Sequence, residues 1–198
     1  MDTQQSTELL IKDTAKKIFF VDGHINATTQ EIADAAGVNR TLLNYYFRSR
    51  DALFNEVYED TKQEKSKYFL KVLDSELPLK EKVEKIIDIL QNYISRYPYA
   101  EVFLISEMNK KEKIDLPKAS QKFAKTFQRF LDEADTEIKK GNLRAENARE
   151  FFINLISLIS YPLMTKDLYS EIFNMKAPGF KTFNQKRKEN IIKLFFTN

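Results

Sequence analysis

The stretch TTQEIADAAGVNRTLLNYYF, which runs from residue 28 to residue 47, contains the signals of two short helices joined by a tight turn. Thr28 followed three residues later by Glu31 is a capping-box pattern and predicts that a helix begins at Thr29. Gly37 permits the left-handed backbone at which such a helix ends near Ala36. Helices this short are marginal in water on their own. The pair must therefore pack together, as in a helix-turn-helix motif.

The second of these helices is predicted to present a polar face outward. Asn39 is a favourable N-cap, and Leu43 and Phe47, four residues apart, are expected to face inward. The side chains between them suit a DNA major groove, where Arg bonds guanine, Asn bonds adenine, and Leu or Thr touches the thymine methyl. Tyr and Arg side chains, and the N–H groups at the start of the first helix, suit phosphate oxygens. The predicted DNA-binding residues are Thr28, Thr29, Asn39, Arg40, Thr41, Leu42, Asn44, Tyr45, Tyr46, Arg48 and Arg50.

A plain structural corner with a solvated polar face is the alternative interpretation of this pattern. The overall charge does not decide between the two, because 32 Lys and Arg residues stand against 29 Asp and Glu residues, for a net charge of +3. Acidic and basic residues also balance within residues 1–50. The DNA interpretation therefore depends on where the charges lie, not on their total.

The rest of the chain predicts an all-α fold of eight to ten helices. The 198 residues include only 4 Gly and 5 Pro, and helical periodicity recurs in most windows. A long helix from about Arg50 to Leu73, capped by Ser49, is expected to join a small domain rigidly to a larger one. The predicted domains are a three-helix helix-turn-helix domain over residues 1–48 and a larger helical domain over residues 49–198.

Together with the preceding AKKIFFVDGHINA, the stretch resembles the DNA-binding domain of the tetracycline-repressor (TetR) family. The shared features are Gly23, the Thr-Thr, Ile-Ala and Ala-Gly-Val groups, and the Tyr-rich segment that ends at Phe47. The resemblance covers roughly residues 10–57. This chain departs from the family at Thr41 to Asn44, where many members carry Gly-Thr-Leu-Tyr, so its operator is not expected to be that of its relatives.

The resemblance implies a homodimeric transcriptional regulator, usually a repressor that binds a pseudo-palindromic operator and is released by a small molecule. It also implies that the larger domain holds the ligand pocket and the dimer interface. A pocket for an apolar or aromatic effector is predicted near Tyr93, Phe103, Met108, Phe127 and Phe152, although core packing is the commoner role of any single aromatic residue of this kind. The predicted dimer residues lie on a helix from about Glu146 to Met164 and on the last segment, and they are Phe151, Leu155, Leu158, Ile159, Ile191, Leu194 and Phe195.

Other functions find less support in the sequence. The chain has no Cys and a single His, His24, and it shows no Gly-rich phosphate loop or nucleophile elbow, so neither an enzyme nor a metal or cofactor site is expected. A helical protein-interaction module is the remaining alternative. The polar N-terminus does not resemble a signal peptide, and no apolar run is long enough to span a membrane, so a cytoplasmic protein is expected. Residues 177–188, with a Pro-Gly pair, are expected to form a loop.

Overall fold

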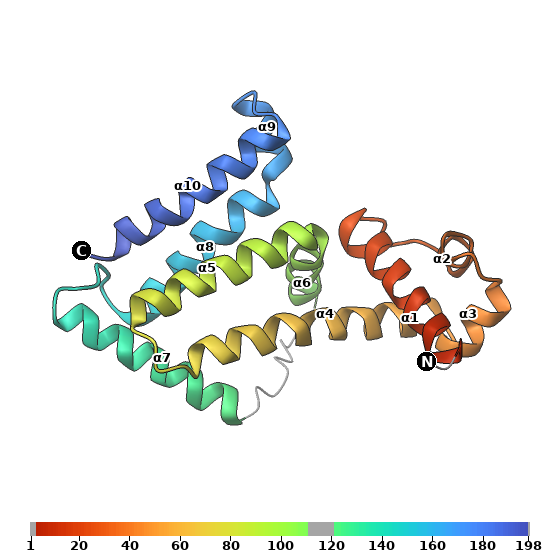
Figure 1. Ribbon diagram of the computed structural model, residues 1–198, viewed down its shortest axis with the longest axis horizontal. Helices are drawn as coiled ribbons and strands as arrows, with labels where there is room; N and C mark the ends of the chain where they lie inside the picture. Colours follow the sequence, from red (N-terminus) through yellow and green to blue (C-terminus); the bar gives the residue numbers. More distant parts are fainter. Residues whose placement is uncertain (1–2, 111–120, 198) are drawn as a thin grey trace.

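The computed structural model describes residues 3–110 and 121–197, which form helices joined by turns and loops (Figure 1). In this part of the chain the only β pairing is a single bridge between Leu143 and Phe196. The predicted all-α fold is therefore confirmed. The helices are α1 (Thr3–Lys16), the π-helical turn η1 (Lys17–Val21), α2 (Thr29–Ala36), α3 (Arg40–Phe47), α4 (Arg50–Leu73), α5 (Leu79–Arg96), α6 (Pro98–Lys110), α7 (Gln121–Lys139), α8 (Ala148–Met164), α9 (Lys166–Ile172) and α10 (Ala177–Phe195).

Two groups of helices are connected by α4. The first group, called the head here, comprises α1, η1, α2 and α3. The second, called the body, comprises α5 to α10. Figure 1 shows α4 running from the head into the body, where it lies beside α5. The bounds of α4 are those that the sequence predicted, and Ser49 caps it by accepting a hydrogen bond from the Ala52 N–H.

A π-helical turn ends the first helix and aims two aromatic side chains into the core. Phe19 and Phe20 are adjacent in sequence, yet both are fully buried. A π-helical turn adds a residue to the α-helical repeat and so changes the direction of the side chains that follow. Phe19 meets Phe54 of α4 edge-on, while Phe20 contacts both Phe54 and Tyr58. The head is thus packed against the first turns of α4.

The pairing of α8 with α10 compensates for a proline. Pro162 lies inside α8 and has no N–H to donate to the carbonyl of Leu158, four residues earlier. The Arg187 side chain of α10 supplies the missing donor, with Nε 3.0 Å from the Leu158 oxygen.

The start of α10 differs from the loop that the sequence predicted. Residues 177–188 belong to α10 and not to a loop, because Pro178 falls in the first helical turn, where no N–H is needed.

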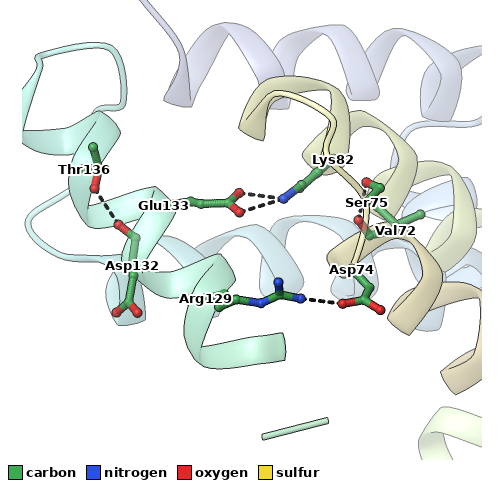
Figure 2. A network of polar contacts seen from close by, with 8 residues as sticks. All are labelled: Val72, Asp74, Ser75, Lys82, Arg129, Asp132, Glu133 and Thr136. Carbon is green, nitrogen blue, oxygen red and sulfur yellow. Dashed lines mark hydrogen bonds and ion pairs between the residues drawn. The ribbon is translucent and has the colours of Figure 1, made fainter. Parts of the chain in front are cut away.

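Charged side chains hold α7 against the corner between α4 and α5 (Figure 2). The Lys82 ammonium lies 2.8 and 2.7 Å from the two carboxylate oxygens of Glu133. The side chain of Lys82 is only 3% exposed, whereas that of Glu133 is 41% exposed. Beside this pair, Arg129 of α7 donates to Asp74 at the end of α4. This end of the body is therefore held by ion pairs.

Candidate nucleic-acid interface

The first helix of the motif, α2, begins at a complete capping box. The Thr28 hydroxyl oxygen accepts a hydrogen bond from the Glu31 N–H at 3.2 Å, and Glu31 Oε2 accepts one from the Thr28 N–H at 2.7 Å. This backbone hydrogen bond is the main reason that the pKa of the Glu31 carboxyl group lies below its usual value. At the other end of α2, Gly37 adopts the left-handed conformation, with φ of 68°. The predicted start and end of this helix are confirmed.

The second helix, α3, is capped and oriented as the sequence predicted. Asn39 Oδ1 accepts a hydrogen bond from the Leu42 N–H at 2.8 Å. Leu43 and Phe47 are buried in the same core as α2. The outer face of α3 is formed by Arg40, Thr41, Asn44 and Tyr45, which are all exposed, with Leu42 and Tyr46 half-buried at its edges. Tyr45 is 69% exposed and meets Tyr46 edge-on.

The two arginines after α3 differ in their surroundings. Arg48 is exposed and ends α3 with φ of 44°, a region that residues other than Gly seldom adopt. Arg50 is half-buried, and its guanidinium carbon lies 5.2 Å from the Phe19 ring centroid and 4.9 Å from that of Phe54. Its Nη1 contacts Asp51 at 3.0 Å. Arg50 therefore lies in the joint between the head and α4, and its predicted contact with a DNA phosphate stays a prediction.

A contact between the head and the body was not predicted. Gly23, between η1 and α2, has φ of 77°, and a Cβ placed there would lie 2.7–2.9 Å from three ring atoms of Tyr99. Tyr99 is the second residue of α6. Sequence periodicity marks Gly23 as the end of a helix, but no local signal connects it with a residue so far along the chain. The side chain of Tyr99 thus lies directly on the turn that precedes α2.

The predicted pocket residues lie in separate ring clusters within the described residues. Tyr93 packs against Tyr97, and Phe103 packs against Phe54 and Tyr58. Phe127 and Phe152 contact each other, with ring centroids 4.8 Å apart. The side chain of Met108 lies outside the described residues. These contacts pack the rings against the core, and the prediction that they line an effector pocket stays a prediction.

The predicted dimer residues mostly face the protomer's own core. Phe151, Leu155, Ile159, Ile191 and Phe195 are at most 6% exposed. They cannot meet another subunit without opening that core, so this part of the prediction is corrected. Leu194 is 56% exposed and Leu158 is half-buried. Another side of α8 carries Ile153 and Tyr161, which are 59% and 55% exposed.

Metal-binding clusters and membrane-spanning helices are both absent from the residues that the structure describes. Among the described side chains, no group of three or more His, Asp or Glu residues is arranged to hold a metal ion. Of the helices in residues 3–110 and 121–197, none has both the length and the apolar character that crossing a membrane requires.

Comparison with known proteins identifies the head and the fold. Residues 11–57 match the family described as bacterial regulatory proteins, tetR family. No curated protein matches the chain. Among solved structures, the hemolysin II transcriptional regulator HlyIIR is 20% identical, with 98% of this chain and 99% of that chain covered and a TM-score of 0.59. The ketosteroid transcriptional regulator KstR2 of Mycobacterium tuberculosis is 14% identical, with 100% of this chain and 96% of that chain covered and a TM-score of 0.66. At these identities the two structures establish the fold, and the family match over residues 11–57 confirms the resemblance to the tetracycline-repressor family.

Proposed function

We propose that this chain, whose residues 11–57 match the tetR family of bacterial regulatory proteins, is a repressor that binds a pseudo-palindromic operator as a homodimer and is released by a small molecule. In this proposal residues 1–48 read the DNA, and residues 49–198 bind the effector and form the dimer. Its action on DNA places the protein in the cytoplasm.

The exposed face of α3 is the observation that carries the proposal. Arg40, Thr41 and Asn44 have the side chains that bond base edges in the major groove, and the structure leaves all three in solvent. The two N-caps and the buried Leu43 and Phe47 hold this face in one orientation. A fixed array of base-reading side chains is what sequence recognition requires.

The outward faces of α8 and α10 support the homodimer. Ile153 and Tyr161 lie on α8 and Leu194 lies on α10, and each is more than half exposed. Contiguous apolar side chains on a protein surface often mark an interface. A two-fold dimer through these faces would set two copies of α3 against half-sites about 34–36 Å apart or a multiple of that spacing. Changing Ile153 to Asp and Leu194 to Glu should therefore convert the dimer to a monomer in sedimentation analysis. The exposed Lys193→Glu variant is a matched control.

The experiment that tests the function is selection from random duplex DNA, followed by sequencing of what the purified protein retains. We expect an enriched inverted repeat. Recovery of DNA without an enriched sequence, even at low salt, would contradict the proposal and would favour a helical protein-interaction module. Binding of the repeat should weaken steeply as salt rises, because released counterions drive the association.

Single substitutions on α3 then test how the sequence is read. Arg40→Ala should lose roughly 1–3 kcal/mol of operator binding and relax the preference at one base pair. Arg48→Ala should weaken binding to all sequences about equally, because phosphate contacts carry no base information. A uniform loss in the Arg40 variant would show that Arg40 contacts only the backbone of the DNA.

Release by an effector would act through the spacing of the two heads. In the proposed mechanism, a molecule bound in the body shifts α4, and the two copies of α3 no longer fit adjacent half-sites. A ligand that favours the wrong spacing lowers DNA affinity by linkage. Distances between spin labels on the two heads should therefore change when an effector is added. An unchanged distance would contradict this mechanism.

A further inference from the structure

A cavity of about 390 Å³ lies where the end of α5 meets the end of α8 and the start of α10. Its size is within the range of small-molecule binding sites. The apolar part of its wall comes from Ile94, Leu163 and Phe180, which are 1%, 6% and 3% exposed. Gln91 Nε2 of α5 donates to the Asn184 carbonyl of α10 at 3.2 Å. This hydrogen bond joins two walls of the cavity.

The ionisable side chains of this cavity all carry the same sign of charge. Among the described residues that line it, Lys166 and Lys181 are the only ionisable ones, and the other polar groups are amides and the Ser95 hydroxyl. The Lys166 ammonium lies 5.9 Å from the centroid of the Phe180 ring, at the apolar wall. Both lysines are exposed, and they have no acidic partner among the described lining residues. Neutral donors and two such ammonium groups beside an apolar wall favour an organic anion.

The hollow beside α7 provides a contrast within the same body. Its basic residues Lys80, Arg129 and Lys140 share the lining with Asp132, Glu133 and Glu137. Lys140 is also paired with Glu137 at 2.8 Å. Carboxylates already balance the positive charge of this hollow. We therefore expect an anion to bind there only weakly. The cavity between α5, α8 and α10 differs by having no carboxylate among its described lining residues.

We propose that the cavity between α5, α8 and α10 is an effector site for a small organic anion with an apolar body. The two lysines bind the anionic group, the amides and Ser95 add hydrogen bonds, and the apolar wall takes the rest of the molecule. The effector role rests on the function proposed above.

The position of the cavity explains how its occupant reaches the head. Pro98 is both a lining residue of the cavity and the first residue of α6. The next residue, Tyr99, has its ring against Gly23 in the turn before α2. A molecule that presses on Pro98 is thus one residue away from the contact between body and head.

The test uses three probes that share one ring system and differ in charge: 2-naphthoate, 2-naphthamide and (2-naphthyl)methylammonium. Calorimetric titration of the full chain should give the highest affinity for naphthoate and the lowest for the ammonium probe. Lys166→Gln together with Lys181→Gln should weaken naphthoate roughly tenfold or more, because each charged hydrogen bond contributes measurably to affinity. Lys193→Gln, an exposed lysine of α10 that does not line the cavity, is the matched control and should bind naphthoate as the unaltered chain does.

Three results would overturn the proposal. They are equal affinity for the three probes, no naphthoate binding at millimolar concentration, and unchanged naphthoate affinity in the double lysine variant. These titrations contain no DNA, so their result does not depend on the outcome of the DNA selection. With a selected operator, bound naphthoate should change DNA affinity, and Tyr99→Ala should remove that change while leaving naphthoate affinity intact. Naphthoate binding without an effect on DNA affinity would overturn the effector role.

Discussion

At its N-terminal end α4 is held by aromatic rings, and at its C-terminal end it is held by charged side chains. Phe54 contacts the rings of Phe19, Phe20 and Phe103, and the Arg50 guanidinium lies over the rings of Phe19 and Phe54. At the far end, Asp74 pairs with Arg129 of α7, close to the Lys82–Glu133 pair (Figure 2).

This difference indicates how the two joints should respond to conditions. Buried rings are held by dispersion and by their removal from water, and neither depends strongly on salt. Ion pairs at a surface are weak and are screened as the ionic strength rises. We therefore expect the head to follow α4 as one unit, while the corner with α7 loosens more readily. The free energy of unfolding distinguishes the two joints when it is measured at one protein concentration, because dimer stability depends on concentration.

The largest effect is expected at the centre of the aromatic joint. Phe54→Ala should lower the free energy of unfolding by about 3–5 kcal/mol, because it removes a buried ring and leaves a cavity. Chemical denaturation followed by circular dichroism measures the loss. Phe173→Ala, at a ring that is 56% exposed on the far side of the body, is the control. Similar losses in the two variants would contradict the special role of the joint.

Gly23→Ala should weaken the contact between head and body. The loss in unfolding free energy should be about 2 kcal/mol, since a left-handed backbone is costly for Ala and the new methyl group displaces the Tyr99 ring. In a Tyr99→Ala background the same change should cost less, because only the backbone penalty remains. An equal cost in both backgrounds, determined by thermal unfolding of the four proteins, would show that the ring contact contributes nothing.

At the ionic end the two partners should respond unequally. Glu133→Gln leaves the buried Lys82 ammonium without a counter-charge and should lower the free energy of unfolding by roughly 1–2 kcal/mol. Lys82→Met should be nearly neutral, because the half-exposed Glu133 carboxylate can return to water. Urea denaturation of both variants provides the comparison. A larger loss for Lys82→Met than for Glu133→Gln would mean that the ion pair itself is strongly stabilising.

Substitution of Arg48 by Gly is expected to change protein stability and DNA affinity in opposite directions. Arg48→Gly should raise the free energy of unfolding by about 0.5–1 kcal/mol, because glycine adopts a positive φ without strain. The same variant should bind operator DNA more weakly if Arg48 contacts phosphate. Calorimetric melting and a DNA titration measure the two effects. A less stable variant would contradict the strain attributed to this turn.

The smallest effect is expected for the exposed ion pair at the end of α4. Arg129→Gln should lower the free energy of unfolding by about 0.5 kcal/mol at low salt, and 1 M salt should remove most of that difference. Repeating the denaturation at both salt concentrations tests this point. The loss of unfolding free energy in Phe54→Ala should be the same at both salt concentrations. A salt-dependent loss at Phe54 would remove the proposed contrast between the two ends.

The sequence predicted the head more accurately than the body because the signals in the head are local. Thr28, Gly37 and Asn39 each act on backbone groups within a few residues, so the ends of α2 and α3 can be placed without knowing the tertiary fold. The placement of Arg50 is the exception. Its surroundings depend on Phe19, which lies 31 positions earlier in the chain.

The body shows where local patterns become insufficient. α8 is apolar around most of its circumference, so periodicity could not show that Leu155 faces the core while Ile153 faces solvent. The contacts that decide this come from α5, α7 and α10. The Pro-Gly pair at residues 178–179 is typical of a turn, yet it also fits the first turn of a helix. The contact between Gly23 and Tyr99 has no local signal at all.

The bond from Arg187 to the Leu158 carbonyl restricts the mechanical freedom of the body. A shift of one residue along a helix is about 1.5 Å, which exceeds the range of lengths over which a hydrogen bond remains strong. The bond therefore opposes sliding of α8 along α10 and favours movement of the two helices together. If these helices form the proposed dimer, rotation of whole subunits against each other is the change of arrangement that keeps this bond intact. Such a rotation swings both heads through an arc without altering the register of the helices at the interface.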